Sequence, residues 1–211
     1  MTKDIANIFK ASLMVHKNSG LISNLEGLVR TLEYKPIGEE KTRKIAFPVD
    51  CTEPENCNEC DDLIKCVPER RKKCLVYFEG NNSREIASLE KATRYEANLS
   101  LICWYNLFFF QSSTFLQTRL ISLMSEVIRK TNVNADGSLP ISFVNPEITL
   151  VSDSDAGIFS KYTYNEQKSN FLGCNYSTFK IDFKVKFTLY EDKNCINGIV
   201  GVANVDCIGN V

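Results

Sequence analysis

Apolar residues recur at helical spacing in two stretches of the chain. In the first stretch, residues 3–17, Ile5, Phe9 and Leu13 lie four positions apart. The second, residues 112–132, has a wider apolar stripe, and the Ser-Ser-Thr run at its start can cap a helix. The stripe consists of Leu116, Leu120, Leu123 and Val127, widened by Met124 and Ile128. We therefore predict an N-terminal helix and one main amphipathic helix.

Shorter apolar stretches have the pattern of β-strands. The sequences GLVRTLEY and TRKIAFPV flank KPIGEEK, whose Pro and Gly indicate the turn of a hairpin. KKCLVYFEG reads as a short strand that ends at Gly80. A further strand is predicted over residues 141–151, where Pro140 and Pro146 favour an edge position or a bulge.

Two longer stretches predict the main strands of the sheet. Residues 97–110 are apolar on both faces, which is typical of a strand at the centre of a sheet. One of these faces carries Leu99, Leu101, Cys103, Tyr105 and Leu107, and the other carries Ile102 and Trp104. Residues 181–189 alternate apolar and polar side chains without error, so we expect one core face and one solvated, lysine-rich face.

Together these elements predict an α+β fold, in which an antiparallel-rich sheet carries the N-terminal helix and the main amphipathic helix. The chain has 211 residues, of which 44% are hydrophobic and 24% charged, so a single domain over residues 1–211 can bury a substantial core. The net charge of -1 provides no global basic field, which argues against general nucleic-acid binding through phosphate neutralisation.

The sequence favours a protein made in a cytosol without membrane association. Its most apolar run, residues 101–110, is too short to span a bilayer. Residues 1–17 lack the basic, apolar and small-residue regions of a signal peptide. The cysteine count, nine, is odd, which agrees with free thiols or metal ligands rather than a disulfide framework.

Five cysteines are concentrated between residues 51 and 74, on a long loop predicted to connect two strands. They are Cys51, Cys57, Cys60, Cys66 and Cys74. Thiolate zinc sites commonly offer two CxxC pairs, whereas this loop has one, Cys57 and Cys60. Spacing alone leaves zinc binding, transient disulfides and incidental surface thiols open. We predict a fold that depends on no metal and no cofactor.

The same loop separates its charges by sign. Its first arm carries Asp50, Glu53, Glu55, Glu59, Asp61 and Asp62, and its last carries Lys65, Arg70, Arg71, Lys72 and Lys73. One interpretation is a hairpin-like loop whose two arms neutralise each other. The other is a subunit interface, in which the acidic arm of one copy meets the basic arm of the next and builds a ring.

The sequence does not assemble an acid, a base and a nucleophile, so we predict that the protein is not an enzyme. His16 is the only histidine, and it falls near the end of the first predicted helix. Neither a dinucleotide-binding glycine motif nor a phosphate-binding loop is present. The two carboxylates of SDSDAG, residues 152–157, lie in a sequence typical of a turn.

The order of the predicted elements resembles that of certain virion proteins. A helix, a hairpin, two strands and an amphipathic helix are followed by a Tyr-rich loop that leads into the alternating strand. The segments that carry the resemblance are VYFE, LICWYNL, and FSKYTYNEQ followed by STFKIDF. Over residues 20–190 the chain resembles the neck and tail-terminator-like proteins of tailed bacteriophages, most closely the head-to-tail ring proteins of crAss-like phages.

This resemblance implies a tail-terminator-like fold and a structural role in the virion. Such proteins form homo-oligomeric rings in the phage neck or tail, as head-to-tail connectors or tail terminators. They line and seal the conduit through which genomic DNA passes without sequence-specific binding. The resemblance further implies neighbouring neck, portal or tail proteins as partners, synthesis in the host bacterial cytoplasm, and no cofactor. The cysteine-rich loop and the segment after Cys195 depart from the compact terminator pattern.

The C-terminal residues 195–211 have one charged side chain, Asp206, and suit an arm that packs on a neighbouring copy or on its own domain. A rival hypothesis is a cytosolic accessory protein whose zinc-braced loop binds nucleic acid through ERRKK. Metal content and mass in solution separate the two hypotheses. A metal-free ring supports the first, and a zinc-loaded monomer supports the second.

Overall fold

The computed structural model describes twelve parts of the chain: residues 1–18, 20–34, 45–51, 63–67, 71–80, 83–90, 92–110, 115–131, 141–153, 158, 162 and 175–190. Its elements, in chain order, are α1 (Thr2–Asn18), β1 (Asn24–Leu28), β2 (Arg30–Tyr34), β3 (Ile45–Cys51), β4 (Leu63–Lys65), β5 (Cys74–Gly80), β6 (Arg84–Leu89), β7 (Ala92–Asn106), the 3-10 helix η2 (Leu107–Phe109), α2 (Leu116–Lys130), β8 (Ile141–Ser152) and β9 (Tyr176–Tyr190).

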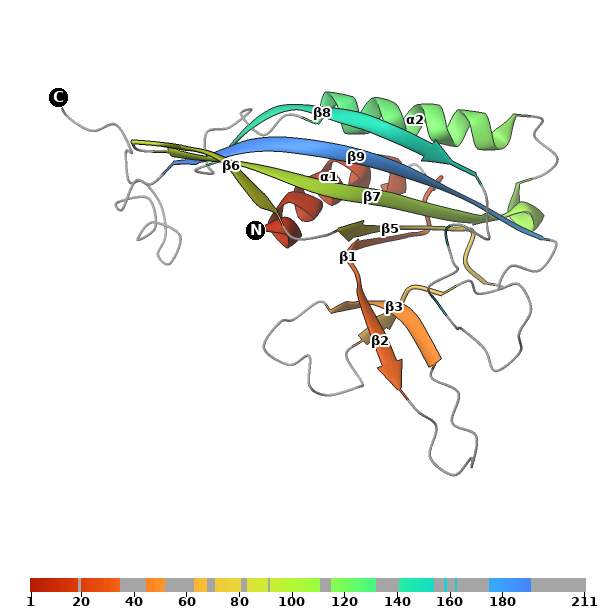
Figure 1. Ribbon diagram of the computed structural model, residues 1–211. Helices are drawn as coiled ribbons and strands as arrows, with labels where there is room; N and C mark the ends of the chain where they lie inside the picture. Colours follow the sequence, from red (N-terminus) through yellow and green to blue (C-terminus); the bar gives the residue numbers. More distant parts are fainter. Residues whose placement is uncertain are drawn as a thin grey trace, which may run out of the picture.

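The main sheet is built around the long strand β7 (Figure 1). Its strands follow the order β1-β5-β7-β9-β8, and β6 pairs with the part of β7 that β5 leaves open. Strand β9 pairs with β7 along its whole length, from Ala92 to Asn106. Strand β1 runs parallel to β5, whereas the other pairs in this sheet are antiparallel. The predicted α+β class with an antiparallel-rich sheet is confirmed.

A smaller sheet, of order β2-β3-β4, projects from one edge of the main sheet (Figure 1). The predicted hairpin is confirmed, because β2 and β3 pair antiparallel from Arg30 to Tyr34. However, the single stretch GLVRTLEY is divided between two sheets. The backbone N–H of Val29 still bonds to Phe78 of the main sheet, at 2.8 Å, and the next residue begins β2.

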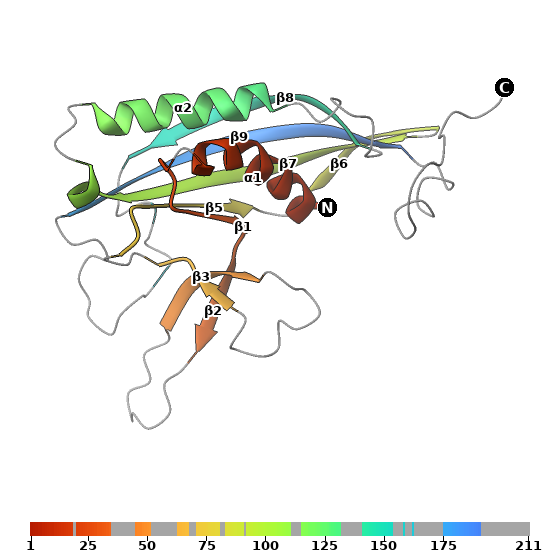
Figure 2. The same ribbon diagram turned by 180° about the vertical axis from the view of Figure 1, so that it is seen from behind.

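Both helices cover the same face of the main sheet (Figure 2). The predicted stripe of α1 is confirmed, since Ile5, Phe9 and Leu13 are buried there. Phe9 meets Phe183 of β9 edge to face, with ring centroids 5.0 Å apart. Burying such side chains contributes roughly 1.5–3 kcal/mol each, so this layer between helices and sheet is the main source of stability.

Helix α2 differs from its prediction at its start and in the part of its stripe that faces the sheet. It begins at Leu116 with Phe115 as the N-cap residue, and no side chain caps it. Leu120, Met124 and Ile128 are fully buried, whereas Leu116, Leu123 and Val127 are only partly buried. Apolar residues cover a wide face of this helix, so their spacing alone did not show which of them would be buried against the sheet.

The predicted edge position of β8 and core face of β9 are confirmed, whereas of the lysines on the second face of β9 only Lys186 is exposed and Lys180 and Lys184 are half-buried. Strand β8 lies at the edge of the sheet, and its register shifts between Val144 and Glu147, on either side of Pro146. The alternation of β9 buries Ile181, Phe183, Val185 and Phe187 against the helices.

The central strand ends earlier than predicted. Strand β7 stops at Asn106, and the side chain of Asn106 accepts a hydrogen bond from the backbone N–H of Phe108 at 3.0 Å. This cap turns the chain into η2, so Leu107 is exposed instead of lying on the core face.

Candidate functional site

The structure describes Arg71, Lys72 and Lys73 of the predicted charged interface. Arg71 is exposed, whereas Lys72 and Lys73 are half-buried and bond within their own chain. The Lys72 ammonium donates to the carbonyl of Lys65 at 3.4 Å, and that of Lys73 donates to the carbonyl of Gly20 at 3.1 Å. The Lys73 ammonium also lies 4.8 Å above the ring of Phe110.

Six further residues of that interface lie outside the described residues. They are Glu53, Glu55, Glu59, Asp61, Asp62 and Arg70. The predicted loop over residues 51–74 includes the short strand β4, which pairs with β3. The C-terminal arm, residues 195–211, also lies outside the described part.

Two cysteines of the predicted cluster are buried on opposite faces of the main sheet. Cys74 lies on the helix-covered face, with its sulfur 3.6 Å from that of Cys103. Cys66 packs under the other face. Burial raises the pKa of the Cys66 thiol well above its usual range, and the charges of Glu26 and Asp50 raise it further. Because the sheet separates the two sulfurs, Cys66 and Cys74 cannot bind one ion.

We expect metal removal to leave the fold intact. Within the described residues no group of three or more His, Cys, Asp or Glu side chains could hold a metal ion. A strong zinc chelator should leave the thermal midpoint of unfolding nearly unchanged, as measured by circular dichroism. A structural zinc site supplies folding free energy, so a fall of tens of degrees would show that Cys51, Cys57 and Cys60 take part in such a site.

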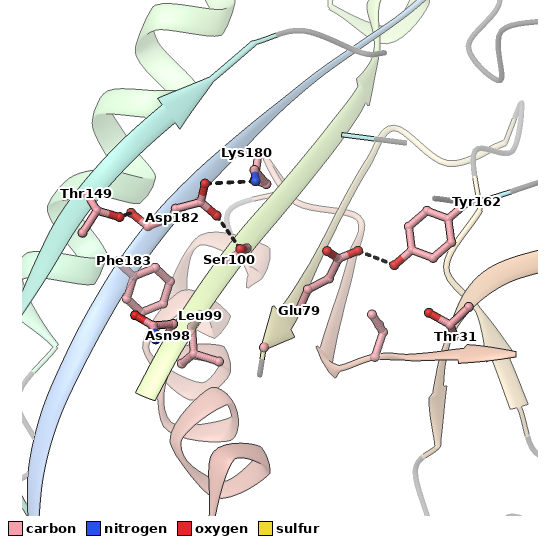
Figure 3. Close-up of a pocket in the computed structure, with 12 residues that line it drawn as sticks. Thr31, Glu79, Asn98, Leu99, Ser100, Thr149, Tyr162, Lys180, Asp182 and Phe183 are labelled. Carbon is pink, nitrogen blue, oxygen red and sulfur yellow. Dashed lines mark hydrogen bonds and ion pairs between the residues drawn. The ribbon is translucent and has the colours of Figure 1, made fainter. Parts of the chain in front are cut away.

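A polar cleft of about 620 Å³ opens on the face of the main sheet that the helices leave uncovered (Figure 3). Its walls come from the small sheet, through Thr31, and from the edge strand β8, through Thr149. On its floor, Asp182 pairs with the Lys180 ammonium at 2.9 Å and accepts a short hydrogen bond from Ser100. The cleft is therefore lined mainly by hydroxyl and charged groups that already contact one another.

Most polar side chains of the cleft are paired with one another. The Ser100–Asp182 hydrogen bond joins β7 to β9, and the Lys180 ammonium pairs with the same carboxylate. At the other end of the cleft, the buried Tyr162 donates a short hydrogen bond to Glu79. These pairs tie β7 to β9 and connect residue 162 to β5.

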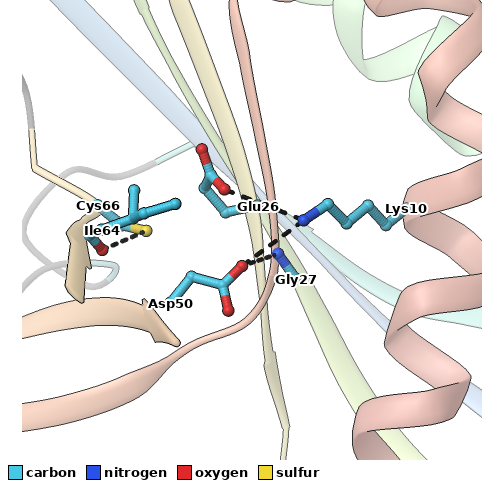
Figure 4. Close-up of polar contacts among 6 residues, drawn as sticks. All are labelled: Lys10, Glu26, Gly27, Asp50, Ile64 and Cys66. Carbon is cyan, nitrogen blue, oxygen red and sulfur yellow. Dashed lines mark hydrogen bonds and ion pairs between the residues drawn. The ribbon is translucent and has the colours of Figure 1, made fainter. Parts of the chain in front are cut away.

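A buried ionic cluster joins α1 and both sheets (Figure 4). The Lys10 ammonium lies 3.6 Å from the Asp50 carboxylate and 4.0 Å from that of Glu26. Asp50 also accepts a hydrogen bond from the backbone N–H of Gly27, at 2.7 Å. A Cβ at Gly27 would lie 3.0 Å from the Asn7 side chain, so a glycine allows this close approach. The sequence analysis did not identify this cluster and wrongly placed Asp50 in the acidic arm of the charged loop, whereas its carboxylate is buried between α1 and the two sheets.

Large apolar side chains are exposed where β7 ends and α2 begins. We call this set, Leu107, Phe108, Phe109 and Phe115, the aromatic end. Phe108 is 81% exposed and Phe115 73% exposed, although both lie beside a well-packed core. The neighbouring Phe110 is instead held against Tyr105, with the rings 6.1 Å apart. The aromatic end thus holds four of the exposed large apolar side chains of the described surface, three of them phenylalanines.

Comparison with known proteins gives no family for the chain. No protein-family model matches it, and no curated protein matches it in sequence. Neither helix of the described part is long and apolar enough to cross a membrane.

Proposed function

We propose that the protein is a virion structural protein that forms a homo-oligomeric ring in the neck or tail of a tailed bacteriophage. In this role it is a head-to-tail connector or tail terminator that lines and seals the DNA conduit. Its partners are copies of itself and the neighbouring neck, portal or tail proteins. Genomic DNA passes through the lumen without sequence-specific contacts, which agrees with the net charge of -1.

The aromatic end carries this proposal. Phenylalanine side chains that stay exposed together on a folded surface typically mark a contact with another protein. In an assembly they would be buried between subunits, whereas a monomer would leave them in water. The polar cleft is compatible with a structural role, because the Ser100–Asp182 hydrogen bond in it joins β7 to β9.

We expect assembly to depend on the charged loop and on salt. Replacing Arg70 and Arg71 together by glutamate should lower the population of rings, because each copy then loses its attraction for the acidic arm of the next. Lys72 and Lys73 stay unchanged in this test, since both contact their own chain. Light scattering measures the assembly, and circular dichroism checks the monomer fold. Raising the salt concentration should weaken the unmodified assembly as well.

The matched control replaces Arg30 and Arg129, two exposed arginines elsewhere, by glutamate. It changes the net charge by the same amount and should leave the ring population unaltered. If the loop variant assembles like the unmodified protein at equal concentration, the two arms only neutralise each other within one subunit.

A further inference from the structure

We infer that the polar cleft is a binding site for a short neutral saccharide. The cleft is formed by side chains of β2, β5, β7, β8 and β9 together with Tyr162. Its volume of about 620 Å³ lies within the range of roughly 300–1,000 Å³ that is typical of small-molecule sites. The inference stands apart from the proposed ring, because all of these residues belong to one subunit.

The surface that the cleft offers to a ligand is polar. Of its apolar lining side chains, Val29 is half-buried, and Leu99 and Phe183 are only 2% and 1% exposed. A peptide or a lipid presents apolar groups that need an apolar lining. A saccharide instead carries hydroxyl groups around each ring, and these hydroxyls both donate and accept hydrogen bonds. The hydroxyl, amide and charged groups of the cleft suit such a ligand.

The charges in and around the cleft favour a ligand without net charge. The lining includes the carboxylates of Glu79 and Asp182 and the ammonium of Lys180, which pairs with Asp182 at 2.9 Å. Lys184, paired in register with Asn98 of the lining, brings a second ammonium to the edge of the cleft. An anion would therefore meet two carboxylates, and a cation would meet two lysines.

The contacts among Lys180, Asp182 and Ser100 fix the direction of the hydrogen bonds that a ligand can make. The Ser100 hydroxyl gives its hydrogen to Asp182, so its oxygen remains an acceptor. The Lys180 ammonium has three protons, and its contact with Asp182 uses one of them. Because both groups bond to the same carboxylate, a donor and an acceptor lie close together. Two neighbouring hydroxyls of a sugar ring match this pair, one donating to Ser100 and the other accepting from Lys180.

Two further polar side chains extend the site. Within the described part of the chain, the side chains of Asn98 and Thr31 make no hydrogen bond, and both are exposed. Asn98 lies two residues before Ser100 on the same face of β7, about 7 Å away at the usual rise of a strand. Thr31 comes from the wall formed by the small sheet (Figure 3). These groups can bond a second sugar ring, so the site fits a disaccharide.

The cleft is held in shape before a ligand arrives. The Thr149 hydroxyl donates to the backbone carbonyl of Asp182 at 3.1 Å, which ties the wall at β8 to the floor. On the other side, Tyr162 donates to the carboxylate of Glu79. Side chains that are already fixed lose little conformational entropy on binding, which favours affinity.

Saturation-transfer NMR on the full chain tests the inference with four neutral disaccharides: maltose, cellobiose, lactose and sucrose. At least one of them should receive saturation from the protein. The charged probes putrescine, a dication, and citrate, a trianion, should receive none. Absence of a signal from all four disaccharides overturns the inference, and so does a charged probe that binds as strongly as they do.

Substitutions in the cleft show whether the disaccharide is bound there. Asn98→Ala and Ser100→Ala each remove one expected hydrogen bond and should raise the dissociation constant by about three- to tenfold in an NMR titration. Ser88→Ala, which removes an exposed hydroxyl of β6 outside the cleft, is the control and should leave it unchanged. Circular dichroism checks that each variant is folded. Unchanged binding by both cleft variants overturns the inference, whereas the mass in solution, measured separately, decides the ring.

Discussion

We expect the Leu120→Asp variant to lose its cooperative unfolding transition. Leu120 is buried at the centre of the α2 stripe, against the helix-covered face of the main sheet. A carboxylate there has no partner for its charge, and the large leucine side chain is lost as well. The combined cost exceeds the marginal stability of a typical domain. Circular dichroism during heating measures the result.

Two control substitutions on α2 test which side of the helix is packed against the sheet. Ser122→Asp places the same charge on the exposed face and should change the stability by less than about 0.5 kcal/mol. Val127→Asp should be intermediate, because Val127 is only partly buried. A soluble Leu120→Asp protein that melts cooperatively would contradict the position of α2.

The second large effect is expected at the ionic cluster. Replacing Lys10 by methionine should lower the free energy of unfolding by about 3 kcal/mol, because two buried carboxylates then lose their shared cation. This value is at the lower end for a buried pair, since water reaches the half-buried Lys10 side chain. Denaturant unfolding measures the loss.

The matched control is Lys130→Met, which removes a cation from the exposed pair with Glu126. That pair spans one helical turn in water, so its loss should cost no more than about 0.5 kcal/mol. Lys10→Arg, which keeps the charge, should retain most of the stability. Equal losses for Lys10→Met and Lys130→Met would show that the ionic cluster does not hold α1 to the two sheets.

Hydrophobic patterning was sufficient to predict the elements whose burial alternates regularly. The period of two along β9 gave its core face, and apolar residues on both faces of β7 indicated its central place. Pro146 indicated the edge position of β8, since proline cannot donate to a sheet ladder. In each case a local property of the sequence determined the outcome.

The features that the sequence did not predict depend on contacts between distant segments. Lys10, Glu26 and Asp50 come from α1, β1 and β3, and pattern alone does not show that these three elements meet. The available signal was a carboxylate next to an apolar strand sequence, at Glu26 and again at Asp50. The division of Cys66 and Cys74 between two faces likewise depends on tertiary structure, because Cys66 directly follows β4 of the small sheet whereas Cys74 begins β5 of the main sheet.

The aromatic end was missed for a local reason. The run LFFF continues the apolar sequence of β7, so its residues were assigned to the strand. Asn106 interrupts that run, and its side chain caps η2 instead of continuing the sheet. An Asn within an apolar run was therefore the signal that the residues after it leave the core.

The mass of the unmodified chain in solution tests the central claim most directly. One subunit has a mass of 23.9 kDa, and we expect light scattering at low salt to give one defined multiple of this value. Negative-stain images of the same sample should show closed rings with a central opening. A mass of 23.9 kDa at every concentration and salt condition tested would contradict the proposed ring.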